Sequence, residues 1–188
     1  MNIAFVIGHH ANSQGAFSKY LGVTEFEFYN EVSALIDSDI TVFHHVPHIK
    51  GYTNRVRVTA GKINSGEFDL VIEAHFNAAT PQANGVETLY YFDSLKGRQL
   101  AQTFSEIVND ATGIKMRNNG LKALVNPKDR GFASVYYTIP PTILIEPFFG
   151  SNESDCKKIS GAKNTVSLTD SAKNMACIID TFINQISN

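Results

Sequence analysis

The sequence predicts a three-layer α/β/α domain with a mostly parallel central sheet. Short apolar runs rich in β-branched residues alternate with longer segments whose apolar residues recur at helical spacing. The short runs are almost continuously apolar, which is typical of parallel strands that are covered by helices on both faces. With 188 residues and no linker rich in proline, glycine or serine, the chain is expected to form a single domain over residues 1–188.

Five strands and four helices are expected from this patterning. The strands are short and apolar, and they span Ile3–Ile7, Ile40–Phe43, Leu70–His75, Val86–Phe92 and Thr142–Glu146. The helices repeat apolar residues every three or four positions, and they span Glu25–Ile36, Asn54–Asn64, Gly97–Ala111 and Leu168–Ile186. Thr53 and Thr169 are expected to cap the second and fourth helices, because a threonine hydroxyl accepts a hydrogen bond from a free N–H group of the first helical turn.

Composition and charge exclude several classes of protein. The chain carries 16 basic and 18 acidic side chains, so no basic excess supports nucleic-acid binding. No apolar run approaches the roughly 18 residues of a membrane span, so membrane insertion is not expected. The N-terminus lacks the charged start and cleavage site of a signal peptide, which predicts a protein made in the cytoplasm. The two cysteines, Cys156 and Cys177, are expected to be reduced structural thiols.

Three of the expected strands end at residues that suit chemistry better than a core. His9 and His10 follow the first strand, His75 ends the third, and Glu146 ends the fifth, directly before Pro147. Because the carboxyl ends of parallel strands meet at one edge of a sheet, we expect these side chains to lie together. A catalytic zinc ion takes three protein ligands of this kind and leaves a position for water. A separate carboxylate then serves as general base, and Glu146 is the candidate for that role.

The third zinc ligand is expected near the start of the first helix, where Glu25 and Glu27 are both candidates. Val32, Leu35 and Ile36 mark the buried stripe of this helix. Glu25 lies seven residues before Val32 and therefore on the same face, whereas Glu27 is turned about 140° away at 100° per residue. This phase favours Glu25. The helix dipole alone also stabilises a carboxylate in a first turn, so a structural role stays open for either residue.

Other polar residues have competing interpretations. Three histidines follow the second expected strand: His44, His45 and His48. They could form a second metal site, but a solvated loop is the expected state. Glu146 could instead be a buried acid paired with Arg117 or Arg130, because burial of an unpaired carboxylate is costly.

Five segments, in this order, are similar to the motifs of a known enzyme family. They are Gly8–His9, Gly15–Ala16, His75–Ala78, Gly85–Thr88 and Pro141–Asn152. Together they resemble the N-acetylmuramoyl-L-alanine amidases of the Amidase_3 type, in which strands lead into G-H, into H-x-N-A and into a segment that carries the catalytic glutamate. The resemblance spans nearly the whole chain, and three of the matching motifs stand at predicted strand ends.

This resemblance implies a zinc-dependent hydrolase that degrades the bacterial cell wall. It would cleave the amide bond between N-acetylmuramic acid and the L-alanine of the stem peptide in peptidoglycan. His9, Glu25 and His75 would bind Zn2+, and Glu146 would activate the zinc-bound water. Peptidoglycan is then the expected partner, and a monomer is the expected state.

Two departures from the family motifs leave alternatives for the ligands. His10–Ala11 replaces the Gly-Gly that follows the first ligand, so His10 competes with His9. Adjacent side chains at a strand end point in opposite directions, so one of the two is expected to reach the metal. The family also tends to place asparagine four residues after its ligand glutamate. Here Asn30 comes five residues after Glu25 and three after Glu27.

Two other functions and the biological setting remain open from the sequence. A zinc hydrolase of free peptides, similar to a carboxypeptidase, could use Arg130 to hold a terminal carboxylate. A non-catalytic wall-binding module is a third possibility, although it would have no use for a zinc-water site. Asn77 and the segment Asn118–Gly120 are candidates for sugar or peptide binding. The setting that best suits these features is a phage endolysin, which reaches the wall after release at lysis or by another delivery route.

Overall fold

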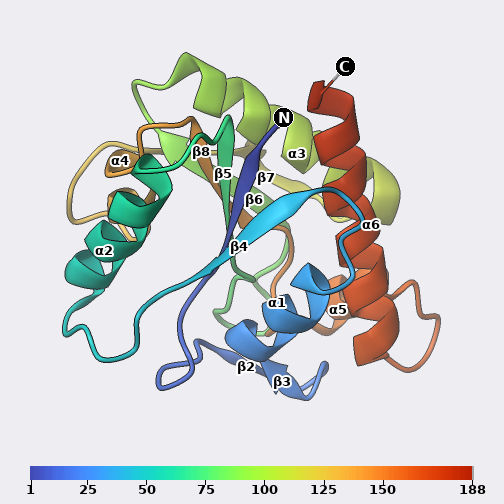
Figure 1. The fold of residues 1–188 in the computed structure, drawn as a ribbon. Coiled ribbons are helices and arrows are strands. Elements are labelled where there is room, and N and C mark those ends of the chain that lie inside the picture. The colour runs from blue at the N-terminus through green and yellow to red at the C-terminus, as the bar shows by residue number, and fades with distance from the viewer. Residues whose placement is uncertain (188) are drawn as a thin grey trace.

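The computed structural model describes residues 1–187 and contains a six-stranded sheet in the order β4-β1-β5-β8-β6-β7 (Figure 1). The strands are β1 (Ile3–Ile7), β4 (Ile40–His44), β5 (Leu70–Ala74), β6 (Val86–Tyr91), β7 (Met116–Leu124) and β8 (Thr142–Glu146). Strands β4, β1, β5 and β8 are mutually parallel, β6 is antiparallel to β8, and β7 is parallel to β6. A small antiparallel pair, β2 (Phe17–Ser18) and β3 (Val23–Thr24), precedes the first helix. The mostly parallel sheet is therefore confirmed.

Helices cover both faces of this sheet, which confirms the three-layer architecture. The helices are α1 (Glu25–Ser33), α2 (Tyr52–Asn64), α3 (Leu95–Thr112), α4 (Phe132–Tyr136), α5 (Glu153–Ser160) and α6 (Leu168–Ser187). Figure 1 shows α2 and α4 on one side of the sheet and α1, α3, α5 and α6 on the other. No helix in the described part of the chain is both long enough and apolar enough to cross a membrane.

Side-chain alternation along the strands builds a separate core on each face. In β1, Ile3, Phe5 and Ile7 join the large core under α1, α3, α5 and α6. Ala4 and Val6 of the same strand join a smaller cluster on the α2 face. Successive side chains of a strand point to opposite faces, so a strand covered on both sides must be apolar throughout. This explains the apolar runs of β1 and β5, which are buried throughout, and of β8, which is buried up to Glu146; β4 lies at the edge of the sheet and is partly exposed.

Segments with a weak hydrophobic signal account for the elements that the sequence did not predict. These are β2, β3, β7, α4 and α5. β7 is an edge strand, and most of its side chains are exposed or half-buried, so it needs no continuous apolar run. Asn118, Asn119 and Gly120 have positive φ angles in the middle of β7, where its pairing with β6 is irregular. α4 has five residues, fewer than a periodic pattern requires to be recognised.

Two helix caps and one helix end differ from the sequence prediction. Gly51, not Thr53, is the N-cap of α2, which begins at Tyr52. α6 begins at Leu168, before Thr169, and the Ser167 hydroxyl accepts a hydrogen bond from the Asp170 N–H. α1 ends at Ser33, so Leu35 lies outside the helix and is 37% exposed instead of forming part of a buried stripe.

Candidate active site

Three neighbouring strands bring the expected catalytic residues to one edge of the sheet. β1, β5 and β8 are adjacent and parallel, so their carboxyl ends lie side by side. His9 follows β1, His75 follows β5, and Glu146 is the last residue of β8. The prediction from the strand ends is correct in this respect, because parallel pairing places all three ends at one level.

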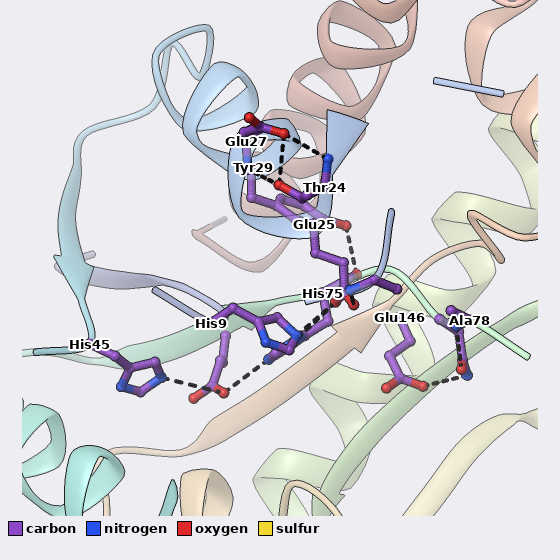
Figure 2. Close-up of polar contacts among 12 residues, drawn as sticks. His9, Thr24, Glu25, Glu27, Tyr29, His45, His75, Ala78 and Glu146 are labelled. Carbon is purple, nitrogen blue, oxygen red and sulfur yellow. Dashed lines mark hydrogen bonds and ion pairs between the residues drawn. The ribbon is translucent and has the colours of Figure 1, made fainter. Parts of the chain in front are cut away.

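His9, Glu25 and His75 form the cluster that could hold a metal ion. Each residue offers one ligand atom, and these atoms all lie within 4.8 Å of one another. Glu25 Oε2 is 3.2 Å from His9 Nε2 and 3.1 Å from His75 Nδ1. Figure 2 shows Glu25 descending from α1 toward the two imidazoles, with Glu146 beside them. The carboxylate therefore comes from a helix and the two imidazoles from strand ends.

The local backbone of His9 is shaped to fit this cluster. His9 has a φ of 67°, a left-handed conformation that a residue with a side chain seldom adopts outside functional or turn positions. Gly15, with a φ of 81°, lies against the ring: a Cβ there would be 2.7 Å from His9 Nε2 and 2.9 Å from Glu25 Oε1. A Cβ on Gly8 would overlap the His75 ring. The two glycines of the sequence motifs leave the space that the ligand side chains occupy.

Glu25 and Glu27 have different partners, although both lie in the first turn of α1. Glu25 is 4% exposed, and its Oε1 accepts a hydrogen bond from the Ala16 N–H at 2.9 Å. Glu27 is exposed and closes a capping box, in which its Oε2 accepts a hydrogen bond from the Thr24 N–H at 2.9 Å. The structure thus places Glu25 with the histidines and Glu27 at the helix N-terminus.

His75 is held by groups from both faces of the sheet. Its Nε2 lies 3.1 Å from Oε1 of Glu73, a residue of β5 that is 4% exposed. Its backbone carbonyl accepts a hydrogen bond of 2.8 Å from the Tyr29 hydroxyl of α1. The sequence analysis overlooked Glu73. Its signal was a charged residue inside an apolar strand, two positions before a candidate ligand and hence on the same face.

Glu146 lies beside the cluster and receives a side-chain hydrogen bond. Asn77 Nδ2 donates to Glu146 Oε2 at 2.6 Å. Asn77 is itself fixed to the loop after β8, because its N–H donates to the Phe148 carbonyl and its own carbonyl accepts from the Gly150 N–H. In the described structure the Asn77 amide therefore faces Glu146, whereas the sequence had suggested sugar or peptide binding.

The ionisation of these groups follows from burial and from their neighbours. Burial raises the pKa of Glu25, but the neighbouring imidazoles of His75 and His9 outweigh it and lower that pKa to about 2. Burial lowers the pKa of His75, but Glu25 and Glu73 outweigh it and raise that pKa to about 10. Burial dominates at Glu146 and raises its pKa above the ordinary value for a glutamate. A carboxyl group with a raised pKa suits general acid and base catalysis near neutral pH.

The donor set fits a divalent transition metal. Two imidazole nitrogens and one carboxylate oxygen are ligands that catalytic zinc sites use. His9 Nε2 is buried and has no hydrogen-bond partner within residues 1–187. In the metal-free protein a proton on His75 Nδ1 can lie between that atom and Glu25 Oε2, at the position that a cation would take. The cluster therefore has the chemistry and the spacing of a metal centre.

The remaining histidines do not gather into a second cluster of the same kind. His44 Nε2 is 3.0 Å from Asn30 Oδ1, and His45 is buried with its Nδ1 2.9 Å from Thr59 Oγ1. Within the described residues, the group of potential metal ligands contains His9 but not His10. The expectation of a solvated loop is wrong for His45, because this side chain is 5% exposed beneath α2.

The other polar residues that the sequence analysis considered do not belong to the cluster of His9, Glu25 and His75. Arg117 pairs with Glu87, at 3.8 Å, and not with Glu146. Arg130 lines the cleft in front of the cluster. Asn118–Gly120 forms the irregularity in β7, where the Gly120 carbonyl accepts a hydrogen bond from Ser105. Both cysteines are free thiols, Cys156 buried and Cys177 exposed, in agreement with the prediction.

The site opens into a cleft of about 630 Å³. His9, Glu25, His75 and Glu146 lie in its wall. Further lining residues come from the start of α2 and from the loop before α4, including Tyr52, Arg55, Lys128 and Arg130. A volume of this size is typical of sites that bind small molecules. The cleft can therefore hold a part of a larger substrate that has the size of a small molecule.

The chain is similar to known proteins in sequence and in fold. Residues 3–176 match the family described as N-acetylmuramoyl-L-alanine amidase, Amidase_3. A search of curated protein sequences gives no significant match. Among solved structures, the chain is similar to the catalytic domain of an endolysin targeting Clostridia difficile, with 25% identity and a TM-score of 0.72. That alignment covers 98% of this chain and 97% of the endolysin domain.

Two further solved structures share the fold at lower identity. The CwlD amidase from Clostridioides difficile, solved in complex with the GerS lipoprotein, is 20% identical with a TM-score of 0.73. The alignment covers 98% of this chain and 96% of that one. An N-acetylmuramoyl-L-alanine amidase of Nostoc punctiforme is also 20% identical, with a TM-score of 0.70 over 100% of this chain and 97% of its own.

Proposed function

The chain belongs to the N-acetylmuramoyl-L-alanine amidase family and hydrolyses peptidoglycan, and we propose that His9, Glu25 and His75 bind the zinc ion for this reaction while Glu146 transfers the proton. One observation carries the proposal: the ligand atoms of two histidines and one glutamate converge within 4.8 Å at the carboxyl edge of the sheet. The family match favours the amidase over a carboxypeptidase or a wall-binding module, because residues 3–176 align with amidases throughout.

The reaction consumes one water molecule and breaks the amide between the lactyl carbonyl of N-acetylmuramic acid and the nitrogen of L-alanine. When bound, zinc supplies a Lewis acid that polarises the carbonyl and lowers the pKa of water. Glu146 accepts the proton that the attacking water loses. The same carboxyl group then donates this proton to the leaving nitrogen, so that a carboxylate and a free amine result.

The environment of Glu146 suits both halves of this proton transfer. Burial raises its pKa and so brings the protonated and ionised forms closer in free energy near neutral pH. The hydrogen bond from Asn77 fixes one carboxylate oxygen at 2.6 Å, and Glu146 lines the cleft. Asn77 is therefore a positioning residue for the proposed base.

The cleft also carries cations that suit a peptide substrate. Arg55, Lys128 and Arg130 line it, and stem peptides of peptidoglycan carry free carboxylates. We expect these cations to favour a substrate whose acidic peptide lies toward α2 and the loop before α4, with the glycan directed outward.

The setting that we propose is the release of stem peptides during cell lysis, by one catalytic domain that acts as a monomer. The similarity to an endolysin catalytic domain supports this setting. Size-exclusion chromatography with light scattering at several protein concentrations tests the monomer, and a mass that rises to that of a dimer would contradict it.

The decisive experiment for the function combines metal analysis with mass spectrometry of digested peptidoglycan. Purified protein should contain about one zinc per chain or regain activity when one equivalent is added. Digestion should release stem peptides with a free L-alanine N-terminus and leave glycan strands without peptides. Release of D-alanine, or cleavage within the stem peptide, would contradict the amidase assignment and favour a peptidase.

A further inference from the structure

The buried carboxylate of Glu73 contacts His75, one of the proposed metal ligands, at the ring nitrogen that does not contact Glu25. Glu73 and His75 are separated by one residue at the end of β5, so their side chains project from the same face of the strand. Glu73 is 4% exposed, and its Oε1 lies 3.1 Å from His75 Nε2. The other ring nitrogen, Nδ1, is the one that lies 3.1 Å from Glu25 Oε2.

The contact determines which nitrogen of His75 is free to bind a metal. A neutral imidazole has one N–H donor and one lone pair, and a carboxylate can only accept. When Nε2–H donates to Glu73, the lone pair is therefore on Nδ1. His75 Nδ1 is the atom that lies 3.1 Å from Glu25 Oε2, inside the candidate metal cluster. A histidine that binds a metal is commonly oriented in this way by a carboxylate on its second nitrogen.

Glu73 is in turn enclosed by residues from the α2 face. His45 Nε2 lies 3.9 Å from the same Glu73 oxygen, and His45 Nδ1 lies 2.9 Å from Thr59 Oγ1 of α2. The Thr59 hydroxyl donates to the Arg55 carbonyl at 3.2 Å. In Figure 2 dashed lines join His45 and His75 to one carboxylate, that of Glu73. Glu73, His45 and Thr59 are buried and Arg55 is half-buried, so little room is left for the Glu73 side chain to turn away from His75.

The position of Glu73 is unusual for a purely structural residue. Val71, two residues earlier on the same face of β5, belongs to the apolar cluster with Ala4, Val6 and Ile63. An apolar side chain at position 73 would continue this cluster without the cost of burying a charge. The His75 imidazole, with Nε2 3.1 Å from Glu73 Oε1, is the group that offsets that cost.

We propose that Glu73 is a positioning residue for the metal centre, which fixes His75 with Nδ1 directed at the metal. The inference rests on the proposed zinc site, because it assigns Glu73 to a ligand of that site. The Glu73 carboxylate does not contact the metal; it acts through the His75 ring. His45, which is hydrogen-bonded to Thr59 of α2, packs 3.9 Å from the Glu73 carboxylate on the side of that helix.

Metal affinity measured on the purified protein tests the proposal separately from catalysis. Glu73→Gln keeps the size of the side chain but removes the acceptor-only carboxylate. We expect its zinc dissociation constant, measured by competition with a chromogenic chelator, to rise about 10- to 100-fold. Glu73→Asp keeps the carboxylate but withdraws it by one methylene, so we expect a smaller rise. The visible spectrum of the cobalt-substituted protein should change in both variants, because the His75 ring is no longer held in one orientation.

Glu87→Gln is the matched control. Glu87 is a buried glutamate of β6, 4% exposed, and its carboxylate pairs with Arg117 and Lys122 and not with a proposed ligand. We expect this variant to lose thermal stability without loss of zinc affinity. If Glu73→Gln lowers only the melting temperature and binds zinc like the wild type, the positioning role is wrong. If Glu73→Gln does not fold, a wild-type affinity in Glu73→Asp overturns the proposal in the same way.

The same measurements distinguish failure of this inference from failure of the proposed zinc site. A wild-type protein that binds no zinc, or a His9→Ala variant that binds it as tightly as the wild type, would overturn the metal centre itself. A wild type that binds zinc together with an unaffected Glu73→Gln variant would overturn only the role of Glu73.

Discussion

Asn77 Nδ2 donates a hydrogen bond of 2.6 Å to Oε2 of Glu146 and joins the loop after β5 to the end of β8. A donor at this distance stabilises the ionised carboxylate more than the protonated acid. Burial acts in the opposite direction and raises the pKa of Glu146. Asn77 therefore limits how far the pKa of the proposed base can rise.

Replacement of Asn77 should move the acid limb of the pH–activity profile. Removal of a hydrogen bond to a charged group costs about 1.5–3 kcal/mol, which corresponds to a rise of roughly 1–2 units in the pKa of Glu146. In Asn77→Ala, and more strongly in Asn77→Asp, kcat/KM should fall off at a higher pH than in the wild type. Zinc affinity serves as the control, and an acid limb that stays in place in both variants contradicts this role for Asn77.

Glu146→Gln should fold and bind zinc but lose hydrolysis. The substitution keeps the shape of the side chain and removes the group that accepts and returns the proton. A positioned general base contributes about 10²–10⁴-fold, so turbidity loss of a peptidoglycan suspension should slow by at least that factor. Zinc content equal to that of the wild type is the control, because Glu87, the buried glutamate paired with Glu146 across β6 and β8, itself raises the pKa of Glu146. Near wild-type turbidity loss by Glu146→Gln would exclude the proposed mechanism.

The parts of the site at strand ends were predictable, because an apolar run that stops at a histidine or a glutamate is visible in the sequence. His9, His75 and Glu146 meet because β1, β5 and β8 happen to be neighbours. Continuous apolar runs indicate parallel strands, but they do not specify the strand order. The order had to come from the structure, and with it the contact between Asn77 and Glu146, which are 69 residues apart.

Helix phase placed Glu25 on the inner face, although part of that argument was wrong. Val32 is fully buried, as expected, but α1 ends at Ser33 and Leu35 is 37% exposed. The phase relation to Val32 alone was sufficient. β7 could not be recognised because its sequence carries charged and amide side chains, most of them exposed, whereas β4, the other edge strand, keeps an apolar run. Glu73 was visible as a charge in an apolar strand, but its partner His45 comes from another strand end.

Zinc binding by variants of Glu25 and Glu27 should distinguish the proposed metal ligand, Glu25, from the residue that caps helix α1, Glu27. Glu25→Ala should abolish zinc binding, because it removes the carboxylate that lies 3.1 Å from His75 Nδ1 and 3.2 Å from His9 Nε2. Glu27→Ala should lower the melting temperature modestly, because it opens the capping box with Thr24, and should leave zinc content unchanged. Metal analysis after dialysis checks both outcomes. Zinc loss in Glu27→Ala but not in Glu25→Ala would reverse the assignment.

The adjacent histidines can be compared in the same way. His9→Ala should lose zinc, whereas His10→Ala should retain it, since the described metal cluster contains only His9 of the two. His10 is 6% exposed, so its replacement should reduce stability. Tighter zinc binding in His9→Ala than in His10→Ala would identify His10 as the ligand.

Gly15→Ala should damage the metal site, while Gly22→Ala should not. Both glycines have positive φ angles, 81° and 76°, so alanine adds a similar backbone strain of about 1–2 kcal/mol at each position. A Cβ on Gly15 would also lie 2.6 Å from His9 Cδ2, whereas a Cβ on Gly22 meets no atom within 4 Å. Both variants should therefore melt at lower temperature, but only Gly15→Ala should bind zinc more weakly. Equal zinc affinity in the two variants would show that the space beside His9 is not needed.

The stability of the metal-free protein should depend on pH through Glu25 and His75. The pKa of Glu25 is lowered to about 2, so its contribution is complete above its ordinary value of about 4.5 and is lost as the pH falls through 2. The pKa of His75 is raised to about 10, so its contribution is complete below its ordinary value of about 6.5 and is lost as the pH rises through 10. Both contributions are complete only between about pH 4.5 and 6.5. The melting temperature of the zinc-free protein should thus decline from pH 6.5 toward pH 10.

Bound zinc should stabilise the protein more as the pH rises, because the metal and the His75 proton compete for Nδ1. At pH 7 the imidazole of the metal-free protein carries a proton that zinc must displace, so binding should release about one proton and strengthen about tenfold per pH unit. Calorimetry in two buffers with different ionisation enthalpies measures that release. The difference in melting temperature between zinc-loaded and zinc-free protein should widen from pH 6 to pH 8. Zinc binding without proton release at pH 7 would mean that His75 is already neutral, and that Glu25 and Glu73 do not hold the proton in place of the metal.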